Sequence, residues 1–106
     1  MGIGMQIVYV GFPGEARIEA EAGVQLLRLM RFAAQVGSCR LAIEAASGPS
    51  GPYYDARLDI VTPDKQFIPL PHCADREPEA AVRAAFDYAE RELVGRASAA
   101  SRVRNE

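Results

Sequence analysis

Two alternating segments on either side of a short loop constrain the fold of this 106-residue chain most strongly. Apolar and polar side chains alternate over residues 38–46 and again over residues 54–60, and the Gly- and Pro-rich loop 47–52 lies between them. Alternation with a period of two places one set of side chains on each face of a strand. The pattern therefore predicts neighbouring antiparallel strands with one buried and one solvated face.

Four further elements are expected on either side of this pair. Residues 5–10 are β-branched and aromatic, which favours a strand, and two other segments carry apolar residues at spacings of three and four, which is typical of helices. The four elements are a strand over 5–10, a helix over 15–36 that ends at Gly37, a short edge strand over 66–70 and a helix from Pro78 to about Val94 that ends at Gly95.

The expected order is β-α-β-β-β-α, which is an α+β two-layer sandwich with a mainly antiparallel sheet and both helices on one face. Residues 5–96 form a single domain, and the small and polar residues 97–106 are expected to be a disordered tail. The residues expected in the core are Ile18, Leu26, Leu29, Leu41, Ile43, Leu58, Ile60, Val82, Phe86 and Leu93, and Leu27 and Met30 are expected to widen the buried face of the first helix.

The composition is that of an ordinary globular domain, with 49% hydrophobic and 25% charged residues. No apolar run reaches the roughly 18 residues of a membrane span, and the first twelve residues hold no Lys or Arg, so neither a membrane anchor nor a secretory signal is expected. We therefore expect a cytoplasmic protein with reduced cysteines. Cys39 is expected to be buried in a strand, and Cys73 is expected to lie in the irregular connection 70–77 and to be more accessible than Cys39.

Residues able to carry catalysis are few. His72 is the only histidine and adjoins Cys73, but adjacent side chains in an extended segment point apart, and no third group is placed to orient the imidazole. No paired metal-ligand spacing and no phosphate-binding glycine loop is present. The sequence therefore predicts no catalytic residue, no metal, no cofactor and no enzymatic activity.

Several short stretches taken together resemble a known family. They are Met5-Gln6-Ile7, the run SCRLAIE from Ser38, the run YDARLDI from Tyr54, and VRAAFD from Val82 followed by Arg91 and Leu93. In this order they resemble the ribosome hibernation promoting factors, also called ribosome-associated inhibitors or sigma-54 modulation proteins, in their short form, from about Met5 to Arg96. The resemblance implies a fold similar to double-stranded RNA-binding domains. It also implies binding to ribosomal RNA of the small ribosomal subunit, in the path of messenger and transfer RNA, which silences translation under stress.

The charge departs from that family, whose helices are typically rich in lysine. Here the net charge is −2, Lys65 is the only lysine, and the second helix is acidic, so RNA binding is expected to be weak and strongly salt-dependent. The candidate RNA-binding residues are Arg28, Arg31, Arg40, Arg57, Arg96, Arg102 and Arg104. The alternative is a divergent, non-catalytic protein-interaction or self-associating module that uses the edge strand 66–70 or exposed Tyr53 and Phe67. Either protein would be a monomer or a weak homodimer.

Overall fold

A computed structural model describes the backbone of residues 3–104 and the side chains of residues 3–98. The order of elements agrees with the predicted α+β class and adds one strand. The elements are β1 (Gly4–Val10), α1 (Ala16–Leu29), the 3-10 turn η1 (Met30–Phe32), β2 (Ser38–Gly48), β3 (Gly51–Val61), β4 (Phe67–Ile68), β5 (Cys73–Asp75) and α2 (Pro78–Arg104).

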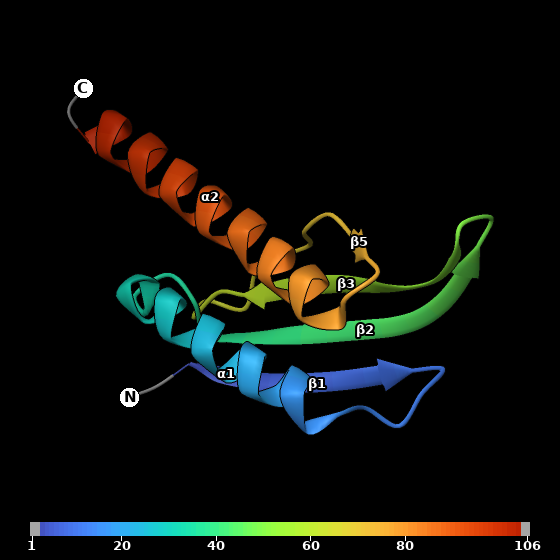
Figure 1. Ribbon diagram of the computed structural model, residues 1–106. Coiled ribbons are helices and arrows are strands. Elements are labelled where there is room, and N and C mark those ends of the chain that lie inside the picture. The colour runs from blue at the N-terminus through green and yellow to red at the C-terminus, as the bar shows by residue number, and fades with distance from the viewer. Residues whose placement is uncertain (1–2, 105–106) are drawn as a thin grey trace.

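The strands form one mixed sheet, and both helices cover the same face of it (Figure 1). β1 runs parallel to β2, whereas β2 and β3 are antiparallel and form the long central hairpin. β4 and β5 both pair with β3, at different places along it. The predicted two-layer, mainly antiparallel sandwich is therefore confirmed.

The strand register explains which face of the sheet is buried. Leu41 lies between Ile7 of β1 and Leu58 of β3, and these side chains point toward the helices. All ten residues predicted for the core are buried except Leu26, which is partly buried against the core. The residues between them, such as Arg40 and Arg57, lie on the opposite face, which no helix covers.

Helix α1 is shorter than predicted, because it ends at Leu29 and a single 3-10 turn follows. The chain must turn back to enter β2 at Ser38, and Phe32 and Val36 are buried in this turn instead of continuing the helical stripe. Leu27 is 71% exposed and Met30 37% exposed, so the prediction that they widen the buried face is wrong. A straight continuation of the helix would carry the chain away from the sheet.

The connection after β3 is more regular than predicted. Its edge strand is only Phe67–Ile68, and β5 forms where an irregular connection was expected. Cys73 lies in β5, where it pairs with Ala56 and is buried, so its predicted loop position is wrong, and it is only slightly more exposed than Cys39. Cys39 is buried as predicted, and both thiols are free.

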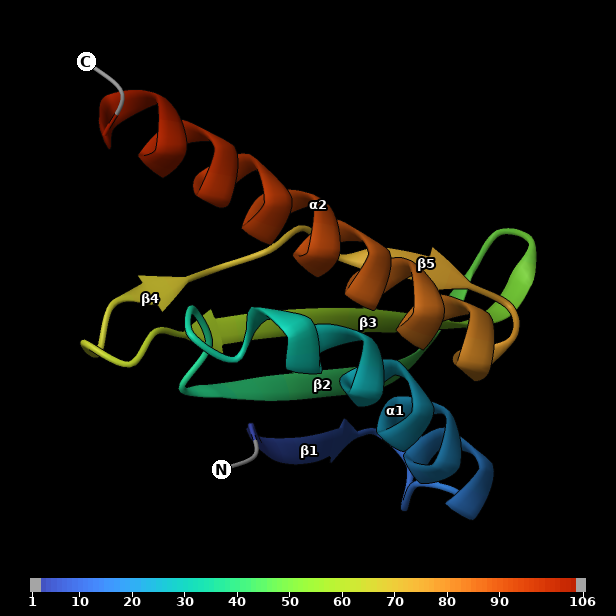
Figure 2. The ribbon, with the colours of Figure 1, turned by 90° about the vertical axis from the view of Figure 1, so that its left-hand side faces the viewer.

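Helix α2 continues to Arg104 and projects beyond the sheet (Figure 2), so Gly95 does not end it. Gly95 has no positive φ, and the following alanines favour helix. Residues 97–104 of the expected disordered tail are therefore helical, and residues 105–106 lie outside the described part. Within the described residues, no helix is long and apolar enough to cross a membrane.

Candidate nucleic-acid interface

The seven candidate arginines do not form one surface. Arg28 and Arg31 lie at the end of α1 and in η1, and Arg96 lies on α2, all in the helical layer. Arg40 on β2 and Arg57 on β3 lie on the open face of the sheet. The structure places the backbone of the remaining two candidates, Arg102 and Arg104, in the last turns of α2 but does not describe their side chains.

Arg28 is held between the two helices by acidic side chains of α2. Its Nη1 lies 3.0 Å from Asp87 Oδ1, and its Nη2 donates to Glu90 Oε2 over 3.1 Å. Nη1 also donates to Gln25 Oε1 at 2.6 Å. Arg31 reaches the same Glu90, with 3.3 Å between Nη2 and Oε1, and its guanidinium lies 4.7 Å from the centre of the Phe32 ring. Both arginines are thus already engaged by groups of this chain.

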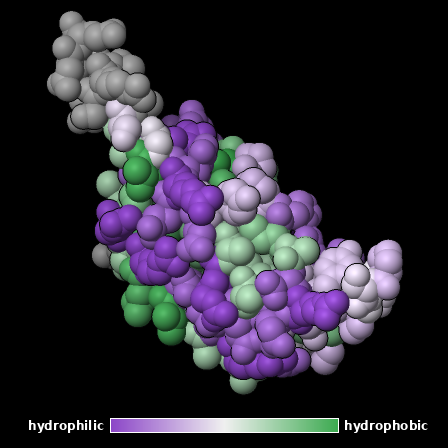
Figure 3. Space-filling model, turned by 45° about the horizontal axis from the view of Figure 1, so that its top comes forward, coloured by the Kyte–Doolittle hydropathy of each residue, from purple (hydrophilic) through white to green (hydrophobic). Residues whose placement is uncertain are grey.

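Three further arginines of the helical layer are paired in the same way, whereas Arg91 contacts only the ring of Tyr88 among the described residues. Arg83 of α2 donates to Glu21 of α1 over 2.8 Å, and Arg96 lies 3.4 Å from Glu92 one turn earlier. Arg17 also contacts several carboxylates, namely those of Glu15, Glu77 and Glu79. The side of the molecule shown in Figure 3 is largely hydrophilic. Because most of its arginines are paired with carboxylates, this surface has little net positive charge to attract a phosphate backbone.

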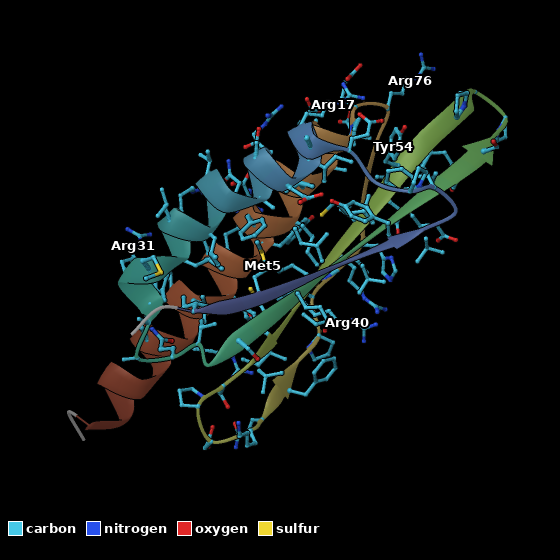
Figure 4. The ribbon with its side chains drawn as sticks, turned by 90° about the horizontal axis from the view of Figure 1, so that it is seen from below. Met5, Arg17, Arg31, Arg40, Tyr54 and Arg76 are labelled. Carbon is cyan, nitrogen blue, oxygen red and sulfur yellow. The ribbon has the colours of Figure 1, made fainter. Side chains whose placement is uncertain are left out.

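The open face of the sheet differs, because Arg40 has no partner there. Among the residues whose side chains are described, no hydrogen bond, ion pair or aromatic contact involves Arg40, and the residue is exposed. Every other arginine with a described side chain has at least one such contact. Figure 4 shows Arg40 on the sheet, apart from Arg17 on α1 and Arg31 on η1. Among the arginines whose side chains are described, Arg40 is therefore the most available to an external anion.

Arg57 shares this face with a buried carboxylate. Its Nε lies 3.3 Å from Asp59 Oδ2, and the Asp59 side chain is only 7% exposed. Neither Arg57 Nε nor Asp59 Oδ1 has a hydrogen-bond partner among the described residues. Asp59 is the direct cross-strand neighbour of Arg40, so the two arginines flank one carboxylate. The local charge is therefore +1, from two guanidinium groups and one carboxylate.

These residues surround a hollow of about 500 Å³ on the open face. Gly4, Ser38 and Val61 form one row across three strands, and Phe67 continues this row on β4. The hollow is completed by Met5, Gln6, Cys39, Arg40, Arg57 and Asp59. The sequence identified Arg40, Arg57 and Phe67 separately, but only the register brings them around one hollow.

The groups considered for catalysis lie elsewhere on the sheet. His72 Nδ1 is 2.5 Å from Asp55 Oδ2, and Asp55 faces Glu44 across the β2–β3 hairpin. The neighbouring Cys73 is buried, and burial raises the pKa of its thiol, which disfavours a thiolate. Among the described residues, no group of three or more His, Cys, Asp or Glu is placed to hold a metal ion.

Comparison with known proteins identifies the fold by structure rather than by sequence. No protein-family model matches the chain, and no curated protein matches it. A solved ribosomal subunit interface protein from Coxiella burnetii superimposes with a TM-score of 0.75 at 9% identity, over 91% of this chain and 99% of that chain. The N-terminal domain of Protein Y from Thermus thermophilus gives a TM-score of 0.61 at 18% identity, over 88% of this chain and 96% of that chain. Both belong to the hibernation-factor family that the sequence resembles, so the fold implied by that resemblance is confirmed.

Proposed function

We propose that this protein is a cytoplasmic, ribosome-associated factor of the hibernation type, which binds the small ribosomal subunit and silences translation. The observation that carries the proposal is the match of nearly the whole chain, at a TM-score of 0.75, to a protein described as a ribosomal subunit interface protein. The collinear sequence resemblance from about Met5 to Arg96 points to the same family. No catalytic step is part of the proposal.

The charge distribution indicates how such binding would work. Most arginines of the helical layer already form ion pairs with carboxylates of this chain, so a contact with a phosphate requires exchange of one ion pair for another. The gain per exchange is small, because surface ion pairs contribute little in water. Binding therefore depends on a few unpaired cations, foremost Arg40, and falls steeply as salt concentration rises.

A second candidate is a non-catalytic protein-interaction module of the same fold. The observation that favours it is an apolar stripe on the outside of α1, where Val24 is 59% and Leu27 71% exposed. These two side chains are three positions apart and thus neighbours on the helix surface. Such a module would bind a protein partner or a second copy with little dependence on salt.

Co-sedimentation of the purified protein with isolated small and large ribosomal subunits across a salt series tests the proposal. The expected result is binding to the small subunit at low salt that is lost as salt increases. Added protein should also reduce the output of a reconstituted translation reaction at the same low salt. An Arg40→Glu variant should bind less than Arg91→Glu, which changes an exposed arginine of α2 by the same charge. Folded protein that binds neither subunit at low salt would exclude the proposed function.

A further inference from the structure

Phe67 is an aromatic side chain that the sheet holds in solvent. It pairs with Val61 at the edge of the sheet, whereas the next residue, Ile68, pairs with Ile60 and is buried under the helices. Phe67 therefore points to the open face, where it is 61% exposed. A single exposed apolar residue is ordinary, but this ring borders the hollow that contains the unpaired Arg40.

Small side chains in the row of residues that includes Phe67 leave space in the hollow. Val61 lies directly beside Phe67, but beyond it Ser38 has a short side chain and Gly4 none, so the floor stays open from Ser38 onward. Arg40 lies two residues along β2 from Ser38, and β2 is two strands across from Phe67, which is roughly 10 Å in the direction of the hydrogen bonds. The Arg40 side chain spans only part of this distance, so the two groups can contact the base and the phosphate of one nucleotide that lies between them.

From this juxtaposition we infer that the hollow bounded by Phe67, Arg40 and Arg57 binds a single-stranded RNA segment, with a base stacked on Phe67 and the adjoining phosphate on Arg40. Aromatic rings are stacking platforms for unpaired bases, and arginine forms forked hydrogen bonds to phosphate. The inference deepens the proposed function and rests on it for the choice of RNA. It adds a contact on the open sheet face to any contact that the helical layer makes.

The charge and the short edge strands favour a single-stranded RNA segment over an RNA duplex or an added β-strand. The hollow carries a net charge of +1, which attracts one or two phosphates but does not neutralise the two backbones of a duplex. A partner strand added to the sheet edge would form few backbone hydrogen bonds, because β4 has only two residues and β5 only three. Asp59 is buried against Arg57, so it positions this arginine along the wall of the hollow.

The test uses the full chain, a fluorescein-labelled oligouridylate as probe, and fluorescence anisotropy at low salt. Phe67→Ala is expected to weaken binding about tenfold, which is the usual effect of removing one stacking ring. Arg40→Gln is expected to weaken binding several-fold and to reduce the slope of log affinity against log salt by about one. Leu27→Ala and Arg91→Gln are the matched controls, since they remove an exposed apolar residue and an exposed arginine from the helical layer.

The controls are expected to bind as the wild type does, and all variants are expected to melt as the wild type does, because all four side chains are exposed. Equal binding by Phe67→Ala and wild type, or equal losses in Arg40→Gln and Arg91→Gln, would overturn the inference. If wild type co-sediments with the small subunit while Phe67→Ala retains its oligouridylate affinity, only the inference fails. If the oligouridylate depends on Phe67 but no ribosomal subunit is bound, the inference holds and the proposed function fails.

Discussion

Arg28 of α1 and Asp87 of α2 form an ion pair across the two helices, with 3.0 Å between Nη1 and Oδ1. Glu90, one turn further along α2, contacts both Arg28 and Arg31. The acidic residues that distinguish this chain from the lysine-rich family that its sequence resembles are therefore not scattered charges. They face Arg28 of α1 and Arg31 of η1 and neutralise them.

Removing these carboxylates should strengthen the proposed binding to the ribosome. The double variant Asp87→Asn and Glu90→Gln frees Arg28 and Arg31 and raises the net charge by two. The expected result is tighter co-sedimentation with the small subunit and a steeper dependence on salt, because more counterions are released from RNA. Unchanged or weaker binding would show that the helical layer does not face RNA.

A matched variant separates this effect from the change in net charge. Asp64→Asn and Glu44→Gln also raise the net charge by two, and neither carboxylate contacts an arginine in the described part of the chain. Binding should then increase only slightly, through the long-range field. Equal gains in the two double variants would contradict a specific role for Arg28 and Arg31.

Truncation of a core residue should destabilise the domain strongly. Phe86 is 1% exposed and lies on the face of α2 that packs against the sheet. Phe86→Ala should lower the free energy of unfolding by about 3–5 kcal/mol, measured by urea denaturation. Leu27→Ala, at 71% exposure, should change it by less than about 0.5 kcal/mol. The opposite ranking would refute the placement of the core.

The features of the fold that were predicted correctly rest on periodicity. The alternation around Leu41 and Leu58 fixes which face of the hairpin is buried, because a shift by one residue would expose both. The wrong predictions concern where helices end, which helical residues are buried, and where short strands form. Leu27 continues an apolar pattern that the tertiary structure leaves exposed, and β5 forms from a segment whose pairing with β3 is set by distance in space, not by local pattern.

The candidate site shows the same limit. Arginines are visible in the sequence, but whether each one is neutralised depends on contacts between residues far apart in the chain. Arg28 and Glu90 are separated by 62 positions and meet only when the helices pack side by side. The grouping of Arg40 with Phe67 likewise depends on the order of strands in the sheet. Composition predicted weak binding but did not indicate which surface keeps free cations.

The stability of the domain should fall at alkaline pH because of Cys39. Burial raises the pKa of this thiol to about 11 from an ordinary value of 9.0. Between these two values the unfolded chain loses the proton and the folded chain keeps it, so ionisation favours unfolding as pH rises. The neutral thiol stabilises the folded state fully below pH 9, and this stabilisation is lost as the pH rises from 9 to 11.

The measurement compares the wild type with Cys39→Ala at each pH. The advantage of the wild type in unfolding free energy should shrink by about 2 kcal/mol from pH 8 to pH 11. The difference between the two proteins isolates Cys39, because other groups that titrate in this range are common to both. A constant difference across this range would mean that Cys39 ionises as readily in the folded protein as in the unfolded chain.

Replacing Gly95 by a residue with a side chain should stabilise the domain, because α2 continues through this position. Its φ is not positive, and an added Cβ would meet no atom within 4 Å. Gly95→Ala removes backbone freedom from the unfolded chain, so it should stabilise the domain by about 0.5–1 kcal/mol and preserve or increase helical content by circular dichroism. Gly23→Ala within α1 is the positive control, since its Cβ also meets nothing within 4 Å. Gly51→Ala should destabilise, because Gly51 has a φ of +107°. Should Gly95→Ala behave as Gly51→Ala does, Gly95 would be a left-handed helix end, and the helical continuation to Arg104 would be refuted.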